Sequence, residues 1–173
     1  MTPVLHGLTS EFAHGRAFSE VVPRANPAVT AGFTYTVASS YWERLAAVSF
    51  VLTSDGNAAN RSVLLTVKDG SGVALDAVPP AAVQVASKVY TYVYARNATP
   101  VNDTLGLVNV QRVPRIFLQP AFSLVVTLTA AQAADQISAI RLYLERFDTG
   151  PEGLPIGMLA ENMYVSEYER VGD

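Results

Sequence analysis

Residues 123–129 read SLVVTLT and alternate apolar with polar side chains over most of their length. The apolar row is Leu124, Val126 and Leu128, and serine or threonine takes three of the four other positions. Residues 61–67 and 137–147 repeat the pattern, with the apolar rows Val63, Leu65, Val67 and Ile140, Leu142, Leu144. Successive side chains of a strand point to opposite faces, so each row predicts a strand with one buried and one solvated face, as antiparallel sheets have.

Turn residues divide the middle of the chain into eight stretches with strand character. These are residues 31–37, 41–53, 61–68, 73–77, 83–95, 107–118, 122–129 and 137–147. The sequence Asp69-Gly70-Ser71-Gly72 is typical of a hairpin turn, and Pro114 predicts an edge or bulged strand in residues 107–118. In residues 41–53 the expected inward row is Ala46, Val48, Phe50 and Leu52. Many short, regularly spaced strands predict an all-β fold, an antiparallel two-sheet sandwich that is jelly-roll-like.

The two ends of the chain lack this alternation. Residues 1–30 contain three prolines and both histidines, and we expect them to form an extended N-terminal arm. Residues 148–173 begin with the turn-rich DTGPEGLP and continue with mixed apolar and acidic residues, which predicts a C-terminal arm. This arm packs along its own sandwich or reaches onto another subunit, and the sequence favours neither. The predicted organisation is an arm, a β-sandwich over residues 31–147, and a second arm.

The composition excludes several functional classes. The 173 residues include no cysteine, which rules out disulfides, thiolate metal sites and cysteine nucleophiles. The formal net charge is −3 and the chain has only two lysines, so a basic groove for nucleic acid is not expected. No apolar run reaches the roughly 18 residues of a membrane span, and the first residues lack the pattern of a secretory signal. Charged residues make up only 16% of the chain, which favours a surface partly covered by another subunit.

Residues suited to catalysis or metal binding are few and scattered. His6 and His14 are the only histidines, and Glu11 is the one carboxylate between them, which is fewer ligands than a stable metal site needs. Four carboxylates lie on expected strands or at their ends: Glu43, Asp135, Glu145 and Asp148. Charges at such positions keep sandwich edges soluble more often than they form the paired carboxylates of a glycosidase. We therefore expect a protein that is not an enzyme and that uses no cofactor and no metal.

Aromatic residues supply the best binding candidates. Tyr90, Tyr92 and Tyr94 share one face of residues 83–95, and the alternate face carries valine and threonine. An exposed row would be a rigid amphipathic surface for a protein partner or, less often, a sugar; a row facing inward would pack in the core, and the sequence leaves both open. Trp42, the only tryptophan, is a candidate core plug or interface anchor. In the C-terminal arm the candidate interface residues are Met163, Tyr164 and Tyr168.

Several segments between residues 41 and 147 resemble small virion proteins of tailed bacteriophages. The first is a strand that opens with an aromatic residue and an arginine, Trp42–Thr53, followed by an Ala-Asn-Arg loop at residues 59–61. The second is the hairpin VLLTVKDGSG at residues 63–72, and the third is ADQISAIRL at residues 134–142. These motifs are strand and turn signatures without a catalytic group, so the resemblance carries over a fold and a role but no active site.

The resemblance implies a jelly-roll-type β-sandwich that assembles on a phage particle. The role it implies is a capsid decoration or cement protein, commonly trimeric, which binds the major capsid protein or other virion proteins. Its location would be the virion, assembled in the host cytoplasm. A tail, baseplate or head-fibre component is an alternative in the same class, although the sequence shows neither collagen-like nor heptad repeats. A carbohydrate-binding jelly roll for host attachment is an alternative from another class, supported by the tyrosine row.

Overall fold

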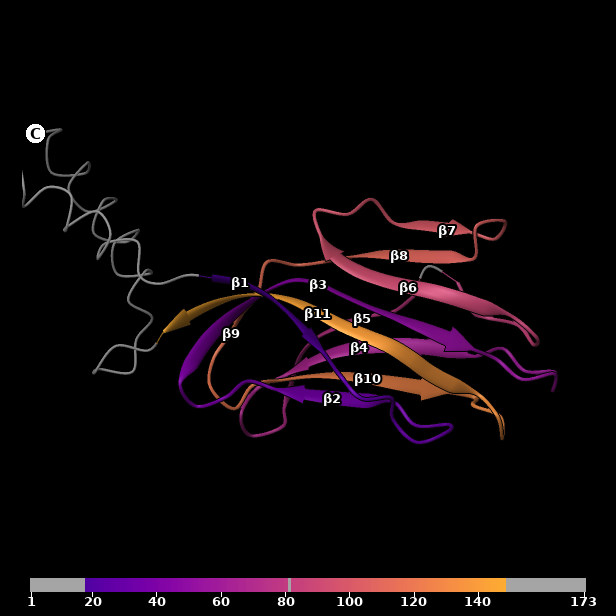
Figure 1. Cartoon of the computed structure of the whole chain (residues 1–173), viewed down its shortest axis with the longest axis horizontal. Helices are drawn as coiled ribbons and strands as arrows, with labels where there is room; N and C mark the ends of the chain where they lie inside the picture. Colours follow the sequence, from indigo (N-terminus) through magenta and orange to yellow (C-terminus); the bar gives the residue numbers. More distant parts are fainter. Residues whose placement is uncertain (1–17, 81, 149–173) are drawn as a thin grey trace, which may run out of the picture.

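The computed structural model describes residues 18–80 and 82–148, and these residues form eleven β-strands and no helix. The strands are β1 Phe18–Pro23, β2 Phe33–Thr36, β3 Tyr41–Thr53, β4 Ser62–Lys68, β5 Ala74–Val78, β6 Val89–Arg96, β7 Val101–Asp103, β8 Val108–Val113, β9 Phe117–Leu118, β10 Ser123–Thr129 and β11 Gln136–Asp148. They build two sheets that lie in two layers (Figure 1). The predicted all-β, two-sheet sandwich is confirmed.

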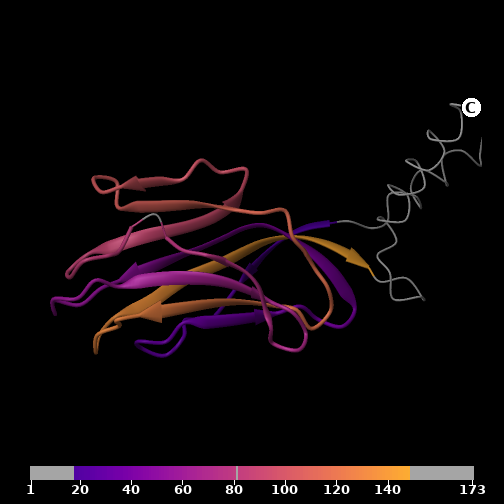
Figure 2. The same ribbon diagram turned by 180° about the vertical axis from the view of Figure 1, so that it is seen from behind.

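The strand pairing is that of a jelly roll. One sheet has the order β1-β11-β3-β6-β8-β7, with β9 also paired to β3, and the other has the order β2-β10-β4-β5 (Figure 2). Four antiparallel pairs are nested along the chain: β1 with β11, β2 with β10, β3 with β6, and β4 with β5. A long hairpin rolled into two four-stranded sheets gives this nesting. The predicted jelly-roll character is therefore visible in the order of the strands.

The first strand of the roll lies in a segment for which the sequence predicted an arm. β1 pairs with β11 along its whole length, from Phe18 opposite Arg146 to Pro23 opposite Arg141. The predicted boundary of the N-terminal arm at residue 30 is therefore wrong, because residues 18–23 form an edge of the larger sheet. Residues 1–17 and 149–173, which include most of both predicted arms, lie outside the described residues.

The segment between β6 and β10 is an insertion in the roll. β8 lies beside β6 and runs parallel to it, so the prediction of a wholly antiparallel sandwich is wrong at this pair. β7 lies between the predicted strands of residues 83–95 and 107–118, and it pairs antiparallel with β8. The chain therefore runs back along β7 before β8 pairs parallel to β6. β8 ends at Val113, directly before Pro114, and β9 then pairs with the start of β3. The predicted strand of residues 107–118 is thus two strands with different partners, and neither belongs to the eight strands of the roll.

The core lies between the sheets and contains the predicted apolar rows. Eight of the nine side chains in the three rows quoted above are buried, and Leu128 packs partly buried against them. The inward row of β3 differs from the prediction at its start, where Leu45 and Glu43 are buried and Ala46 is only half-buried. A β-bulge at Ala46 is the cause, because one extra residue of β3 lies opposite the step from Tyr143 to Leu144 and reverses the alternation.

A buried ion cluster joins the β3–β4 loop to the β10–β11 loop. Arg61 has no exposed surface, and it pairs with Asp55 and, at 2.9 Å, with Asp135. Asp135 also accepts hydrogen bonds from the backbone N–H groups of Asp55, at 2.8 Å, and Gln132, at 2.7 Å. Burial raises the pKa of Asp135, but the hydrogen bonds from Arg61 and the two backbone groups outweigh this and lower it overall. The expectation that Asp135 is a solubilising edge charge is wrong, because this carboxylate holds two loops together.

Candidate functional site

The tyrosine row that the sequence offered as an interface lies in the core. Tyr90 is buried, and Tyr92 and Tyr94 have no exposed surface. Phe50 stacks on Tyr92 with ring centroids 5.3 Å apart, and the Tyr94 hydroxyl donates to the Val63 carbonyl at 3.1 Å. The interface alternative is therefore wrong for this row, and the core alternative is confirmed. The tyrosine row was the support for the carbohydrate-binding hypothesis, and it is not exposed to a ligand.

The remaining candidate interface residues divide between the described body and the C-terminal segment. Trp42 is half-buried at the start of β3, opposite Phe147 of β11. Met163, Tyr164 and Tyr168 lie outside the described residues, so their role stays a prediction. The residues selected from the sequence are therefore not brought together into one site. Trp42 does, however, mark the end of the body where a different cluster lies.

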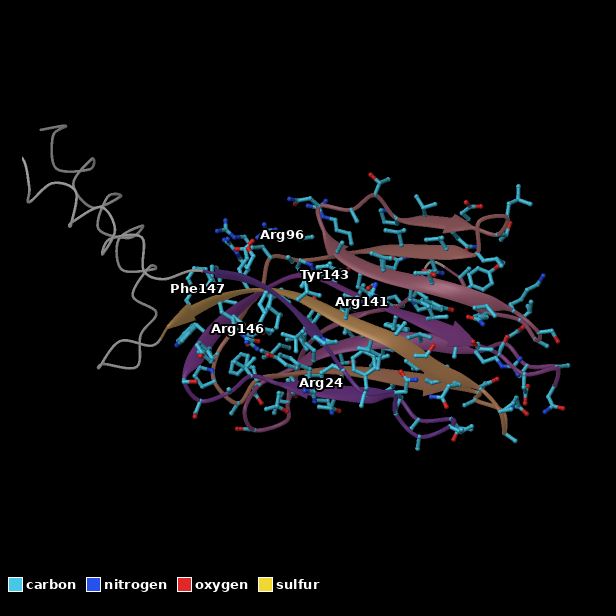
Figure 3. The ribbon with its side chains drawn as sticks, in the orientation of Figure 1. Arg24, Arg96, Arg141, Tyr143, Arg146 and Phe147 are labelled. Carbon is cyan, nitrogen blue, oxygen red and sulfur yellow. The ribbon has the colours of Figure 1, made fainter. Side chains whose placement is uncertain are left out.

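Four arginines from three segments of the chain line a pocket at this end of the larger sheet. The pocket has a volume of about 390 Å³, and its lining is Arg44, Arg96, Asn97, Arg112, Val113 and Arg115. The parallel register of β6 and β8 places Val113 opposite Arg96 at the last step of the pair, and β9 pairs with β3 at Arg44. Figure 3 shows Arg96 at the end of the body where Phe147 also lies. We call this cavity the arginine pocket.

The arginine pocket carries an excess of positive charge. One carboxylate, that of Glu145 on β11, pairs with Arg44 and accepts a longer hydrogen bond of 3.4 Å from Arg96. Arg112 and Arg115 are exposed, and no carboxylate among the side chains described in residues 19–80 and 82–147 forms an ion pair with either. Four guanidinium groups and one carboxylate leave a formal excess of three positive charges.

Two phenylalanines position the guanidinium groups. The rings of Phe117 on β9 and Phe147 on β11 have centroids 6.0 Å apart. The Arg44 Cζ lies 5.6 Å and 5.7 Å from these two centroids, and the Arg115 Cζ lies 5.7 Å from that of Phe117. Guanidinium groups stack favourably on aromatic faces, and such contacts limit the rotamers of a long side chain. The ring contacts therefore restrict the positions that the donors of Arg44 and Arg115 can take.

A second ion network lies on the core side of the same end. Glu43 has no exposed surface, and it accepts hydrogen bonds from the Tyr35 hydroxyl at 2.6 Å and from Arg146 Nε at 2.8 Å. Arg146 also pairs with Glu20. Because β1, β2, β3 and β11 each contribute one group, the network ties both sheets together beneath the arginine pocket. The expectation that Glu43 is a solubilising edge charge is wrong.

The pKa values of Tyr35 and Arg146 in this network are both raised, for different reasons. Burial and the hydrogen bond with Glu43 raise the pKa of Tyr35 to about 12, although Arg146 opposes the rise. Burial lowers the pKa of Arg146, but its contacts with Tyr35 and Glu43 outweigh burial and raise it overall. Tyr35 is therefore neutral and Arg146 charged across the physiological range.

Exposed apolar side chains gather at the other end of β6, which begins at Val89 and ends at Arg96. Val83, Val85 and Val89 are each about half exposed, and Leu105 is 96% exposed. The Val85 carbonyl accepts from Ser54, just beyond β3, and Thr91 N donates to the Leu107 carbonyl, so both loops lie beside the start of β6. We call these four residues the apolar end. The body thus has an apolar end and an arginine-rich end.

The arginine pocket has the chemistry of an anion site. A guanidinium group offers paired N–H donors that match the two oxygens of a carboxylate or a phosphate. The described part of the chain contains no cluster of three or more His, Asp or Glu side chains that could hold a metal ion. The only local sequence signal is Arg112-Val-Pro-Arg115, in which Pro114 predicts an interrupted strand but the two arginines alone do not indicate a pocket. Arg44 and Arg96 are too distant in sequence to be assigned to the same site without the fold.

Comparisons with protein-family models, curated proteins and solved structures found no match to this chain. A search of the described residues for a helix long and apolar enough to cross a membrane also found none.

Proposed function

We propose that this protein is a non-enzymatic structural component of a tailed-phage particle, a decoration or cement protein that binds the capsid lattice and stabilises it. The observation that carries the proposal is that both ends of the chain leave the jelly roll at one place, beside the arginine pocket. Phe18 is opposite Arg146 in the β1–β11 pair, so residues 1–17 and 149–173 start next to each other. Jelly rolls recur in viral coat proteins, which supports the proposal by analogy of fold.

This geometry suits attachment through several weak contacts. At about 3.4 Å per residue, the two terminal segments span at most roughly 60 Å and 85 Å when fully extended. Once one contact to a lattice forms, the others search a small volume at high effective concentration. Two terminal segments at one end of a rigid body would therefore bind a repeating surface more tightly than either segment alone. A capsid offers many copies of one partner within that reach.

We also propose that the apolar end is a contact between copies of this chain. Leu105 and the three valines of that end expose apolar surface in a chain with few charges, which favours burial against another subunit. A trimer is the state that the resemblance to virion proteins implies. Light scattering after size exclusion tests this directly: we expect three times the chain mass of 18.5 kDa. A mass that stays at that of one chain across all concentrations would contradict self-association of the free protein.

The test of the role in the particle is the copy number of the chain in purified virions of the phage that encodes it. Quantitative mass spectrometry should find copies in proportion to the capsomers of the head, and heads that lack the chain should open at a lower temperature. A few copies per particle would indicate a tail, baseplate or head-fibre component. Absence from the particle would refute the proposal.

A glycan array tests the alternative function, carbohydrate binding for host attachment. The aromatic row that supported sugar binding is in the core, so we expect the full chain to bind no glycan. Saturable binding to one glycan class would favour a host-attachment module over a cement protein. The array uses the same purified chain as the light-scattering experiment, so the oligomeric state under test is known.

A further inference from the structure

We propose that the arginine pocket binds the acidic C-terminal segment of its own chain, residues 149–173, and holds it against the end of the jelly roll. This binding does not depend on a role in a phage particle, because it concerns one chain in solution. Its basis is the charge of the pocket, the charge of the segment, and the point at which the segment begins.

The pocket is incompletely neutralised by the body. Glu145 engages Arg44 and Arg96, which remain 19% and 27% exposed, while Arg112 and Arg115 have no ion pair among the described residues. Arg44 and Arg115 both lie against the ring of Phe117, and both guanidinium-bearing side chains line the same cavity. Like charges held together by packing favour an added anion, and carboxylates are the anions that arginine binds with two parallel hydrogen bonds.

The C-terminal segment has the complementary composition. It carries five carboxylate side chains and a single basic residue, Arg170. The carboxylates belong to Glu152, Glu161, Glu167, Glu169 and Asp173. Residues 1–17 start from the same end of the body but contain only Glu11 and Arg16 as charged residues, apart from the two histidines. Charge complementarity therefore selects the C-terminal segment over the N-terminal one.

The segment also begins directly after a strand that contacts two of the pocket arginines. Glu145 and Phe147 of β11 contact the pocket arginines, and β11 ends at Asp148, opposite Tyr41. A segment tethered so close to its site has an effective concentration on the order of 1 mM. If the free segment bound with a dissociation constant of about 0.1 mM, the tethered segment would occupy the pocket in about nine of ten molecules. Binding within one chain is thus favoured over binding to an unlinked partner of equal affinity.

The experiment measures binding of a labelled peptide of residues 149–173 to the full-length chain by fluorescence anisotropy at low ionic strength. Two full-length proteins are compared, the wild type and a variant with Glu161→Gln, Glu167→Gln and Glu169→Gln. The variant should bind the added peptide about tenfold more tightly, because its own segment competes less for the pocket. Equal binding by the two proteins, or no binding to the variant, would overturn the proposal.

Further variants locate the binding on the body. In the glutamine-substituted chain, R112E with R115E should abolish peptide binding, whereas K88E should leave it unchanged. Lys88 is exposed directly before β6, at the other end of that strand from Arg96, so K88E is a charge-reversal control outside the pocket. Both pocket arginines are exposed, and circular dichroism verifies that the double variant is folded. Retention of binding in R112E with R115E would place the peptide elsewhere and contradict the proposal.

A substitution that is expected to tighten peptide binding gives a test that misfolding cannot imitate, because a misfolded protein would bind the peptide less tightly. Glu145→Gln removes the carboxylate that competes for Arg44 and Arg96, so in the glutamine-substituted background it should tighten peptide binding by about tenfold, the effect of about one charge-assisted hydrogen bond. Weaker binding would contradict the assignment of the pocket. Binding of inorganic phosphate by the wild type as tightly as by the glutamine-substituted chain would show a pocket open to free anions, and would also overturn the proposal.

Discussion

Two glutamates that face arginines at one end of the jelly roll should differ sharply in their contribution to stability. Glu43 and Glu145 lie on the paired strands β3 and β11, and each accepts hydrogen bonds from an arginine. Glu43 is fully buried, whereas the side chain of Glu145 is 21% exposed. Glu43→Gln and Glu145→Gln are therefore the same chemical change at a fully buried and at a partly exposed position. We predict that only the first lowers the free energy of unfolding by a large amount.

The magnitude follows from what each substitution leaves behind. Removing one partner of a buried ion pair typically costs about 3–5 kcal/mol. After Glu43→Gln, Arg146 retains Glu20, and the new amide oxygen still accepts from the Tyr35 hydroxyl, so the lower end of the range, about 3 kcal/mol, applies. Partly exposed pairs such as Glu145 with Arg44 typically contribute about 0–1 kcal/mol. The expected difference between the variants is thus at least about 2 kcal/mol.

Urea unfolding followed by circular dichroism measures both variants against the wild type. For a domain of this size, a loss of about 3 kcal/mol corresponds to a lowering of Tm by roughly 6–12 °C, against at most about 4 °C for Glu145→Gln. Equal losses in the two variants would refute the reasoning, because burial would then not decide the strength of these pairs. A change in the urea m-value would instead indicate that the unfolded state had changed.

Three further predictions concern the core and its edges. Tyr92→Phe should leave the free energy of unfolding unchanged or raise it slightly, since the buried Tyr92 hydroxyl has no partner among the described residues. Tyr94→Phe should lower the free energy of unfolding by about 1 kcal/mol, because it removes the hydrogen bond to the Val63 carbonyl. Thermal melts compare the two variants. Gly32→Ala should destabilise by about 1–3 kcal/mol, because a Cβ there would lie 1.8 Å from the Val126 carbonyl oxygen, and an unchanged urea midpoint would contradict this. Stability should fall above pH 10, because burial raises the pKa of Tyr92 and Tyr94 above the value of 10.0 at which exposed tyrosines ionise. The unfolded chain then loses protons that the fold retains, which costs about 1.4 kcal/mol per pH unit for each, so urea midpoints should be lower at pH 11 than at pH 8.

The faces of the main strands were predictable because period-two alternation is a local property. The rows of β4, β10 and β11 are buried as expected, since each strand alternates without interruption through its row. The bulge at Ala46 was not predictable, because β3 alternates on both sides of it and only the pairing with β11 reveals the extra residue. β1 could not be predicted for a different reason. Phe18–Pro23 is an edge strand that ends in proline, and its only strand partner among the described residues is β11, which is distant in sequence.

The arginine-rich end could not be predicted from the sequence. Its four arginines converge only because β8 returns parallel to β6 and β9 folds against β3, and both pairings are non-local. Similarly, Glu43 and Asp135 resembled edge charges because their partners, Arg146 and Arg61, are 103 and 74 residues away in sequence. For the tyrosine row, alternation correctly placed the three side chains on one face of the strand. It gave no information on whether that face points into the core or toward solvent.

The most direct test of the proposed function is a cryo-electron microscopy map of the phage particle that contains this chain. We predict jelly-roll density on the outer surface of the head at repeated lattice positions, with the arginine-rich end and both chain termini directed toward the capsid proteins. Density for the chain only on the tail, or a head whose outer surface lacks it, would contradict the proposed role as a capsid decoration protein.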